Sequence, residues 1–217
     1  MRRVAARFGI ATMVLYRFFP RKADLLTAMT EHALASYEDS THLDLGWRAG
    51  LEYEAWQEWR LYYKHPWLVE VLARSRPPVS PRLMAAVERA LAHLQRAKPP
   101  MRGDHVWLYL TLNAYIQGAA LLASSELAVI PETSSSISPT DLNVEWDSLA
   151  EELEGLLATG NYPHLAAHYL ETLESPSETD APPRRANMTE LDHHEWFQFG
   201  LSRTLDGIEQ YLRQDPP

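Results

Sequence analysis

The stretch "VAARFGIATMVLYRFFPRKADLL", residues 4–26, decides the fold of the first part of this 217-residue chain. Apolar residues at helical spacing predict a short first helix, and Gly9 follows as a turn residue. A second short helix is expected before Pro20, which closes it. The two helices and their tight turn predict a helix-turn-helix. Its buried side is expected to consist of Val4, Ala5, Phe8, Ile10 and Leu15.

Charge is distributed unevenly along the chain. Residues 1–24 carry a net charge of +5, whereas the remainder carries -14 and the whole chain -9. The cations of this first part are Arg2, Arg3, Arg7, Arg17, Arg21 and Lys22, against Asp24 alone. Residues 1–24 therefore form a basic head on an acidic body. Because phosphate neutralisation needs clustered cations, this distribution is typical of a polyanion-binding element attached to a domain with another task. Charge alone also allows a solvated basic terminus.

The remaining chain predicts an all-α protein, because long apolar-periodic segments alternate with Pro, Gly and Ser clusters and no convincing period-2 run occurs. Helices are expected at about 21–36, 46–64, 66–75, 81–97, 103–126, 142–158, 163–174 and 192–213. The helix at 21–36 leads from the motif into the body. We therefore expect a helix-turn-helix domain at 1–38 and a helical-bundle domain at 39–217.

Composition excludes several classes of site. The chain has no cysteine, so disulfides, thiolate zinc sites and cysteine nucleophiles are absent, which fits a reducing cytoplasm. No run of about 18 uncharged apolar residues suggests a membrane span, so the chain is expected to be soluble and cytoplasmic. No Ser-His-Asp arrangement, Gly-rich phosphate loop or Walker pattern can be recognised. We expect neither enzymatic activity nor a cofactor.

The opening stretch resembles the DNA-binding domain of the TetR (tetracycline repressor) family of bacterial transcription regulators. The matching positions are Val4, Ala5, Gly9, Ile10, Thr12, Leu15, Tyr16, Arg17, Phe18, Lys22, Leu25 and Leu26. The rest resembles the family's all-helical regulatory domain through "YYKHPWLVEVLARSRPPVSP" (62–81), "NYPHLAAH" (161–168) and "FQFGLSRTLDGIE" (197–209). The resemblance implies a ligand-responsive regulator, most often a repressor, that binds operator DNA as a homodimer and releases it when a small molecule binds.

The resemblance also implies which side chains touch DNA. The expected contacts are Arg2, Thr12, Met13, Tyr16, Arg17 and Lys22, and Val14 and Phe18 also face the groove. Thr and Met suit base edges or a thymine methyl, the Tyr hydroxyl suits a phosphate, and Arg and Lys suit phosphate or guanine. The alternative for Met13, Val14 and Phe18 is that they pack inside the protein.

Family members carry one more helix before this motif, whereas here the motif begins at Met1. We therefore expect that the natural gene starts upstream or that the chain is truncated. An alternative function follows, namely a small-molecule-binding helical dimer that has lost DNA binding because its head is incomplete.

Large aromatic side chains are frequent between residues 47 and 115, as in the walls of small-molecule pockets, although packing in a plain core explains them as well. The residues expected to bind a ligand are Glu58, Tyr62, Arg76, Val106, Tyr109 and Leu110. Arg76 and Pro77 stand at a helix-loop junction that moves on ligand binding in the tetracycline-responsive members that the chain resembles.

Two apolar stripes predict helix packing. One consists of Phe197, Leu201, Leu205, Ile208 and Leu212, and the other of Leu108, Leu112, Tyr115, Ala119 and Leu122. Periodicity allows either a core within one subunit or a dimer seam. The resemblance favours a homodimer through the helices near 103–126 and 192–213, in a four-helix interface.

Histidines suggest a third class of function. His164 and His168 have i, i+4 spacing, and His193, His194 and Glu195 are adjacent, so a metal site is conceivable. No third ligand is positioned by the sequence, and exposed or capped histidines explain the pattern as well. The sequence therefore favours no metal.

Overall fold

The structure, a computed structural model, describes residues 1–38, 40, 43–74, 76–97, 104–128, 151–167 and 193–213. All regular secondary structure in these residues is helical, as the sequence predicts. Packing divides the chain into two units, one made of Met1–Val129 with Phe197–Pro217 and the other of Ile130–Trp196. The functional residues discussed below lie in the first unit. In the second unit, residues 151–158 and 163–167 are helical.

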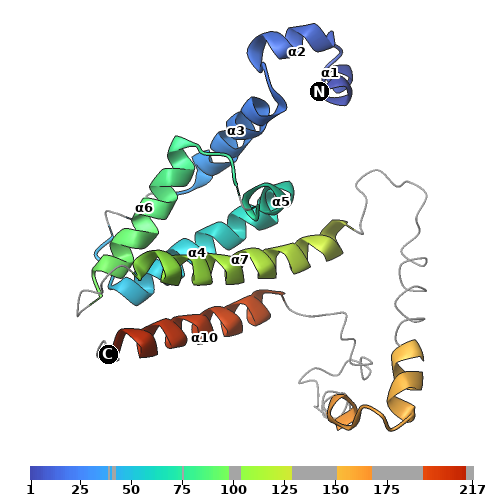
Figure 1. The fold of residues 1–217 in the computed structure, drawn as a ribbon, viewed down its shortest axis with the longest axis vertical. Helices are drawn as coiled ribbons and strands as arrows, with labels where there is room; N and C mark the ends of the chain where they lie inside the picture. The colour runs from blue at the N-terminus through green and yellow to red at the C-terminus, as the bar shows by residue number, and fades with distance from the viewer. Residues whose placement is uncertain are drawn as a thin grey trace, which may run out of the picture. The chain divides into compact units, whose positions relative to one another are not determined.

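The chain begins with α1 (Arg2–Arg7), α2 (Thr12–Phe18) and α3 (Lys22–Ala33), followed by one 3-10 turn, η1 (Leu34–Ser36) (Figure 1). Gly9 turns the chain between α1 and α2 with φ +64°, a conformation that glycine adopts without steric cost. Asp24 caps α3, because its carboxylate accepts a hydrogen bond from the Arg21 backbone N–H at 2.9 Å. The predicted helix-turn-helix is confirmed by these two helices and their turn.

The buried side of this motif is smaller than expected. Ala5 and Leu15 are buried between α1 and α2, but Val4, Phe8 and Ile10 are exposed, Phe8 to 72%. Their predicted burial is therefore wrong within the described residues. Two short helices bury only the residues that face each other, and no other described segment covers these three side chains.

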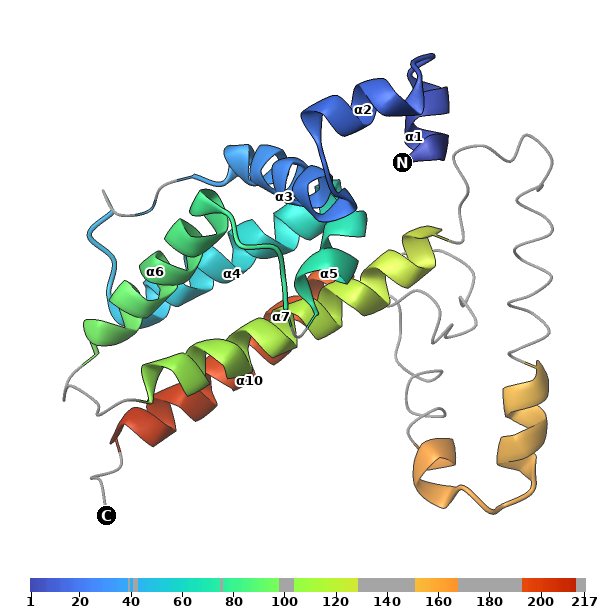
Figure 2. The same ribbon diagram turned by 45° about the horizontal axis from the view of Figure 1, so that its top comes forward.

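The body consists of α4 (Trp47–Lys64), α5 (Trp67–Leu72), α6 (Pro81–Gln95), α7 (His105–Ala128) and α10 (His193–Arg213) (Figure 2). Each lies within a few residues of a predicted helix. Ser80 caps α6 by accepting a hydrogen bond from the Leu83 backbone N–H, and Pro81 takes the first helical position. Helix α4 is central, because it packs against α5, α6 and α7.

Helix α6 crosses α4 at a glycine. A Cβ atom at Gly50 would lie 2.1 Å from Nδ1 of His93 on α6, so only glycine fits there. Beside this crossing, the Ser40 hydroxyl donates to Oε1 of Glu54, and Nε of Arg89 donates to the same atom at 3.2 Å. Nε2 of His93 lies 3.4 Å from Oγ of Ser40. Buried polar groups therefore hold α4 and α6 together with the segment around Ser40 that precedes α4.

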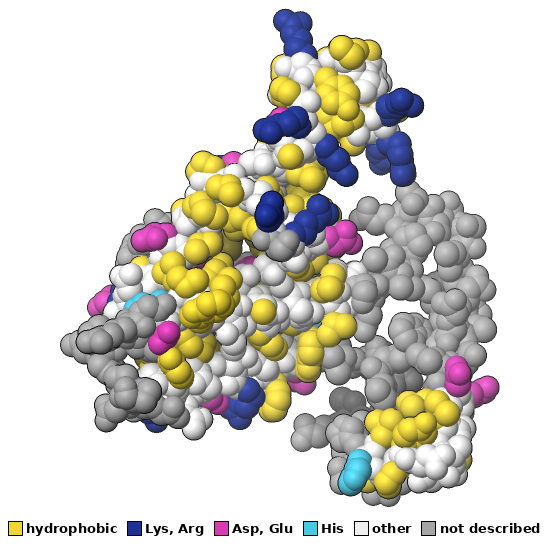
Figure 3. All heavy atoms as spheres, viewed as in Figure 1, with side chains coloured by type: hydrophobic (Ala, Val, Ile, Leu, Met, Phe, Trp, Pro, Cys, Tyr) yellow, Lys and Arg dark blue, Asp and Glu magenta, His cyan; other side chains and the backbone are white. Residues whose placement is uncertain are grey.

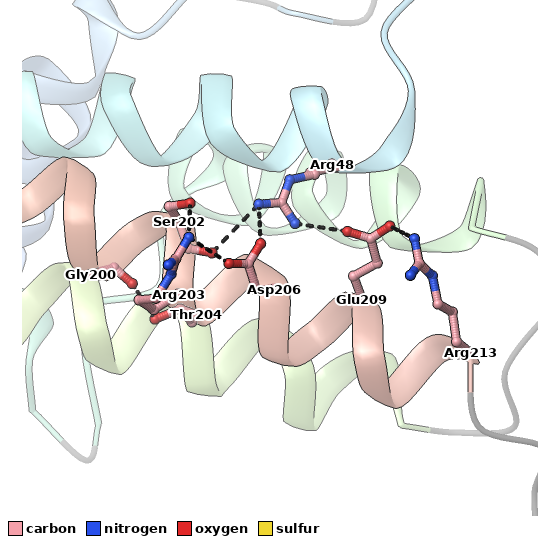
Figure 4. A network of polar contacts seen from close by, with 8 residues as sticks. All are labelled: Arg48, Gly200, Ser202, Arg203, Thr204, Asp206, Glu209 and Arg213. Carbon is pink, nitrogen blue, oxygen red and sulfur yellow. Dashed lines mark hydrogen bonds and ion pairs between the residues drawn. The ribbon is translucent and has the colours of Figure 1, made fainter.

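Helix α10 packs on α4 and α7 through Phe197. The Phe197 ring stacks on Trp59 at 4.3 Å between centroids and meets the edge of Trp56 at 4.9 Å. The Tyr115 hydroxyl of α7 donates to the Phe197 carbonyl at 2.8 Å. At the other end, Arg48 of α4 binds Asp206 at 2.6 Å and Glu209 at 3.0 Å, as Figure 4 shows.

The α10 stripe predicted as a dimer seam is buried inside its own subunit. All five of its members, Phe197, Leu201, Leu205, Ile208 and Leu212, are buried in the single chain. In the α7 stripe, Leu112 and Ala119 are likewise buried, whereas Leu122 is exposed. Periodicity identified the faces correctly, but the α10 face belongs to the subunit core and not to a seam between subunits.

Helix α7 also corrects the expectation about membrane spans. Residues 105–124 contain no Asp, Glu, Lys or Arg and have a mean hydropathy of 1.3, so by length and composition they are apolar enough to cross a membrane. One face of the helix packs on α4, α5 and α6. Asn113 on that helix donates hydrogen bonds to Glu58 of α4, as expected for a helix packed on a protein body.

We predict that Gly50→Ala destabilises the fold, because the new methyl group overlaps the His93 ring. Overpacking of this kind typically costs about 1–3 kcal/mol. Gly155→Ala is the matched control, since a Cβ there meets no atom within 4 Å and lies in an exposed helical segment. Urea unfolding measures both variants. Equal stability of Gly50→Ala and the wild type would show that the α4–α6 crossing is looser than the structure indicates.

Candidate functional site

The first candidate site is the outward face of α2 and its surroundings. Of the six residues expected to touch DNA, five are exposed and Thr12 is half-buried: Arg2, Thr12, Met13, Tyr16, Arg17 and Lys22. Leu15 anchors α2 on α1 from the opposite side, so the helix presents these side chains to solvent. Lys22 follows at the first position of α3. The arrangement offers hydroxyl, thioether and cationic groups on one short helix and its flanks.

Most cations of this head form no ion pair within the described part of the chain. Arg21 is bound by Asp24 at 2.6 Å, and this hydrogen-bonded partner lowers the pKa of Asp24. The other cations, Arg2, Arg3, Arg7, Arg17 and Lys22, make no ion pair within the described part of the chain. Figure 3 shows Lys and Arg side chains gathered over the first helices on the face in view. These cations are available for an external polyanion.

The apolar members of α2 are exposed as well. Met13 is 77% exposed and Phe18 71%, and Val14 is also exposed. The alternative that these three residues pack inside the protein is therefore wrong for the described chain. Exposed apolar side chains next to cations suit contacts with base edges and methyl groups in a groove.

The second candidate site is a cavity of about 480 Å³ between α4, α6 and α7. Its wall is mainly apolar, with Leu51, Ala55, Met84, Val87 and Ile116 among the lining residues. The polar lining groups are Tyr37, Glu54, Glu58, Arg74, Tyr109, Asn113 and Gln117. A mainly apolar cavity of this size with a few polar groups is typical of a small-molecule site.

Glu58 is the central polar group of this cavity. Its Oε1 accepts hydrogen bonds from the Tyr62 hydroxyl at 2.6 Å and from Nδ2 of Asn113 at 3.0 Å. The cavity reaches part of the side chain, but protein atoms surround the carboxyl group. This desolvation raises the pKa of Glu58 to about 7, against the lowering effect of the two hydrogen bonds.

The structure brings together some of the residues expected to bind a ligand. Glu58, Tyr109 and Leu110 line the cavity, and Tyr62 lies behind Glu58 as its hydrogen-bond donor. Arg76 and Val106 are exposed and do not line it, although Arg74 and Pro77 on either side of Arg76 do. Val106 lies in the first turn of α7, one turn before the lining residues.

Sequence reasoning missed the polar lining residues Asn113, Gln117 and Glu54. A signal for them exists, because Asn113 and Gln117 follow Tyr109 at steps of four on α7. Glu54 precedes Glu58 by the same step on α4. Each therefore shares a helix face with a residue that the sequence predicted, Tyr109 on α7 or Glu58 on α4.

The cavity and the head are linked through α6. Helix α6 contributes Met84 and Val87 to the cavity wall, and its first turn holds Arg82. Nη1 of Arg82 donates to Oε1 of Glu31 on α3 at 2.7 Å, and the Arg82 backbone N–H donates to Oε2 at 3.1 Å. Helix α3 in turn follows α2 directly. Helix α6 thus contacts both the cavity and the helix that follows the recognition helix.

The histidines do not come together as a metal site within the described residues. No group of three or more His, Asp or Glu side chains there is arranged to hold a metal ion. His164 is exposed in the helical segment 163–167, and His168 lies outside the described residues.

We predict that Glu58→Gln removes a pH dependence of stability. Between pH 4.5, the ordinary pKa, and about 7, the folded protein keeps the Glu58 proton and the unfolded chain releases it. The free energy of unfolding therefore falls as the pH rises through this range, by at most about 3 kcal/mol. Urea unfolding across the range measures this fall, which should be smaller in Glu58→Gln and unchanged in the control Glu70→Gln, an exposed acid. An equal fall in all three proteins contradicts the assignment.

Comparisons with known proteins agree with this arrangement. The family model for the tetracyclin repressor-like C-terminal domain matches residues 42–212. The HTH-type transcriptional repressor DrrR1 of Streptomyces coeruleorubidus is 36% identical over 215 residues, which are 99% of this chain and 71% of that protein. A crystal structure described as a possible TetR family transcriptional regulator from Streptomyces coelicolor A3(2) is 25% identical, with a TM-score of 0.68 over 97% of this chain and 88% of that one.

A second regulator structure from Streptomyces coelicolor A3(2), 20% identical, shares the fold with a TM-score of 0.60 over 97% of this chain and 86% of that one. The family match covers most of the chain, and the DrrR1 match covers nearly all of it. The chain therefore belongs to the TetR family of ligand-responsive, DNA-binding transcriptional regulators.

Proposed function

We propose that the head binds operator DNA through Arg2, Thr12, Met13, Tyr16, Arg17 and Lys22, with α2 in the major groove. The observation that carries the proposal is the set of head cations without ion pairs in the described part of the chain, beside exposed α2 side chains. Residues 1–38 then act as the DNA-binding domain and residues 39–217 as the regulatory domain. The relatives are transcriptional regulators, and we infer that this chain likewise acts as a regulator, in the cytoplasm and without catalysing a reaction.

The cavity between α4, α6 and α7 binds the small molecule that regulates this activity. Three lining residues, Glu58, Tyr109 and Leu110, contact it, and Tyr62 holds Glu58 in place. A ligand that prefers one position of α6 shifts the position of α3 through the pair of Arg82 and Glu31. Operator affinity then falls by no more than the difference in ligand affinity between the two conformations.

Two copies of the chain form the DNA-binding unit through the outward faces of α7 and α10. On α7 this face consists of Trp107, Thr111, Ala114, Gly118 and Leu121, at helical spacing and exposed in the single chain. On α10 the exposed residues include Phe199 and Tyr211. Small residues between large ones let two helices approach closely, so these faces suit a four-helix interface.

For DNA binding, we predict that Tyr16→Ala and Lys22→Ala weaken binding to all duplexes, because both side chains reach phosphates. Lys22→Ala also lowers the slope of log affinity against log salt by about 1. Thr12→Ala mainly relaxes base preference. Anisotropy titrations measure these effects, with duplexes that the wild-type protein selects from a random library and with the intergenic DNA upstream of its gene.

The control is Arg213→Ala, which removes an exposed cation at the last position of α10, outside the head. It should leave affinity and salt slope unchanged. Unchanged affinity in all three head variants refutes the docking. If the wild-type protein selects no duplex, the alternative function stands, in which a ligand-binding dimer does not bind DNA.

For the dimer, we predict that Trp107→Glu converts the protein to a monomer, because it places a charge within an apolar interface. Trp107 is 70% exposed in the single chain. Val79→Glu is the control, since Val79 is exposed in the segment before α6. Sedimentation velocity gives the molecular mass. A dimeric Trp107→Glu variant, or a monomeric wild type, rejects this interface.

A further inference from the structure

The chemistry of the cavity wall restricts the ligand beyond its size. Two carboxyl groups, Glu54 and Glu58, line the cavity one helical turn apart on α4. Among the described lining residues, the one cation is Arg74, which is exposed to solvent beyond the end of α5. The interior of the cavity therefore has an acidic wall surrounded by apolar side chains.

The two carboxyl groups differ in their counter-charge. Arg89 of α6 pairs with Oε1 of Glu54 at 3.2 Å, which neutralises that group. Glu58 has neutral hydrogen-bond donors only, the Tyr62 hydroxyl and the Asn113 amide, and no described cation pairs with it. A carboxylate away from water needs both hydrogen bonds and a counter-charge to be stable. At Glu58 the protein supplies the hydrogen bonds without the counter-charge.

Two further observations point to a cationic ligand. Glu54 lines the cavity, and its Oε2 atom is buried and has no hydrogen-bond partner among the described residues, so this carboxylate has unused hydrogen-bonding capacity next to the ligand site. Aromatic rings adjoin the carboxyl groups, and Arg89 already lies 5.0 Å above the centre of the Tyr37 ring. Tyr37 and Tyr109 both line the cavity, and an aromatic ring face attracts a cation in the same way.

We propose that the cavity binds an amphipathic organic cation, an apolar ring system with a protonated amine that pairs with the Glu58 carboxylate. This inference rests on the proposed function of the cavity as the regulatory site. An anionic ligand would meet two acids with only Arg74 to bind it. A neutral ligand would supply no counter-charge and would favour the protonated form of Glu58. The amine supplies the missing counter-charge, and the apolar lining takes up the rings.

The test compares three probes with the same rings and different charge. They are 4-(1-naphthyl)butylamine, its N-acetyl derivative and 4-(1-naphthyl)butanoic acid, together with the corresponding anthracene series. Calorimetric titration of the full chain measures binding without DNA. We expect the amine to bind at least about tenfold more tightly than the neutral and anionic probes, in keeping with a charge-assisted hydrogen bond. Glu58→Gln should abolish the preference, whereas the exposed control Glu70→Gln should retain it.

A second readout uses the wild-type protein alone. Because burial raises the pKa of Glu58 to about 7, amine affinity should rise as the pH increases through this value, while the N-acetyl probe shows no such rise. The other groups facing Glu58 are Glu54, Arg74, Arg89 and three tyrosines, Tyr37, Tyr62 and Tyr109. The tyrosines have pKa values above their ordinary 10 and stay neutral in this range. His93, beside Glu54, has a lowered pKa, and Glu58→Gln separates its contribution.

Each outcome decides the inference. Equal binding of all three probes, or a preference that survives Glu58→Gln, overturns the cationic class but leaves the cavity as a ligand site. Failure of every probe to bind also overturns it. The DNA-binding head is tested separately by the titrations with duplex DNA, so the two proposals fail independently.

Discussion

The close crossing of α6 over α4 is the constraint on which the rest of the structure depends. It requires a residue without a side chain at Gly50, because the His93 ring occupies the space that a Cβ would need. The crossing fixes the position of α6, and α6 forms one wall of the cavity and carries Arg82 toward α3. The contact between α4 and α6 thus helps to define both the cavity wall and the position of Arg82 beside α3.

The cluster beside this crossing explains why polar residues are buried in a mainly apolar body. Ser40 and Glu54 are both buried, and His93 and Arg89 complete their surroundings. Such a cluster is stable only while most of its polar groups have hydrogen-bond partners. It therefore favours one arrangement of the two helices over arrangements in which one helix has shifted along the other. One atom of the cluster, Oε2 of Glu54, has no hydrogen-bond partner among the described residues, and Glu54 also lines the cavity.

Much of the fold could be predicted from the sequence, because helix ends are local. Pro81 after Ser80 and Gly9 between two short apolar segments act through their own backbone preferences, and the structure places helix boundaries there. Which segment covers a helix face depends on contacts between distant parts of the chain. The α10 stripe was found by its spacing, yet only the arrangement of α4 and α7 shows that Phe197 lies in the core of its own chain. For the cavity, Glu58 and Tyr109 were predicted. Asn113 shares a helix face with Tyr109, but its hydrogen bond to Glu58 depends on how α7 packs on α4, which is not local.

The position of Phe197 has a consequence for how the protein is made. Trp56 and Trp59, which hold its ring, come from the first third of the chain, whereas α10 is the last helix that the structure describes. During synthesis the partners of α10 on α4 and α7 are therefore completed long before the helix that covers them leaves the ribosome. Contacts between such distant segments form slowly, and uncovered apolar surface is prone to aggregation. The apolar surface of α4 and α7 that α10 covers therefore stays exposed on the nascent chain until its final residues are released.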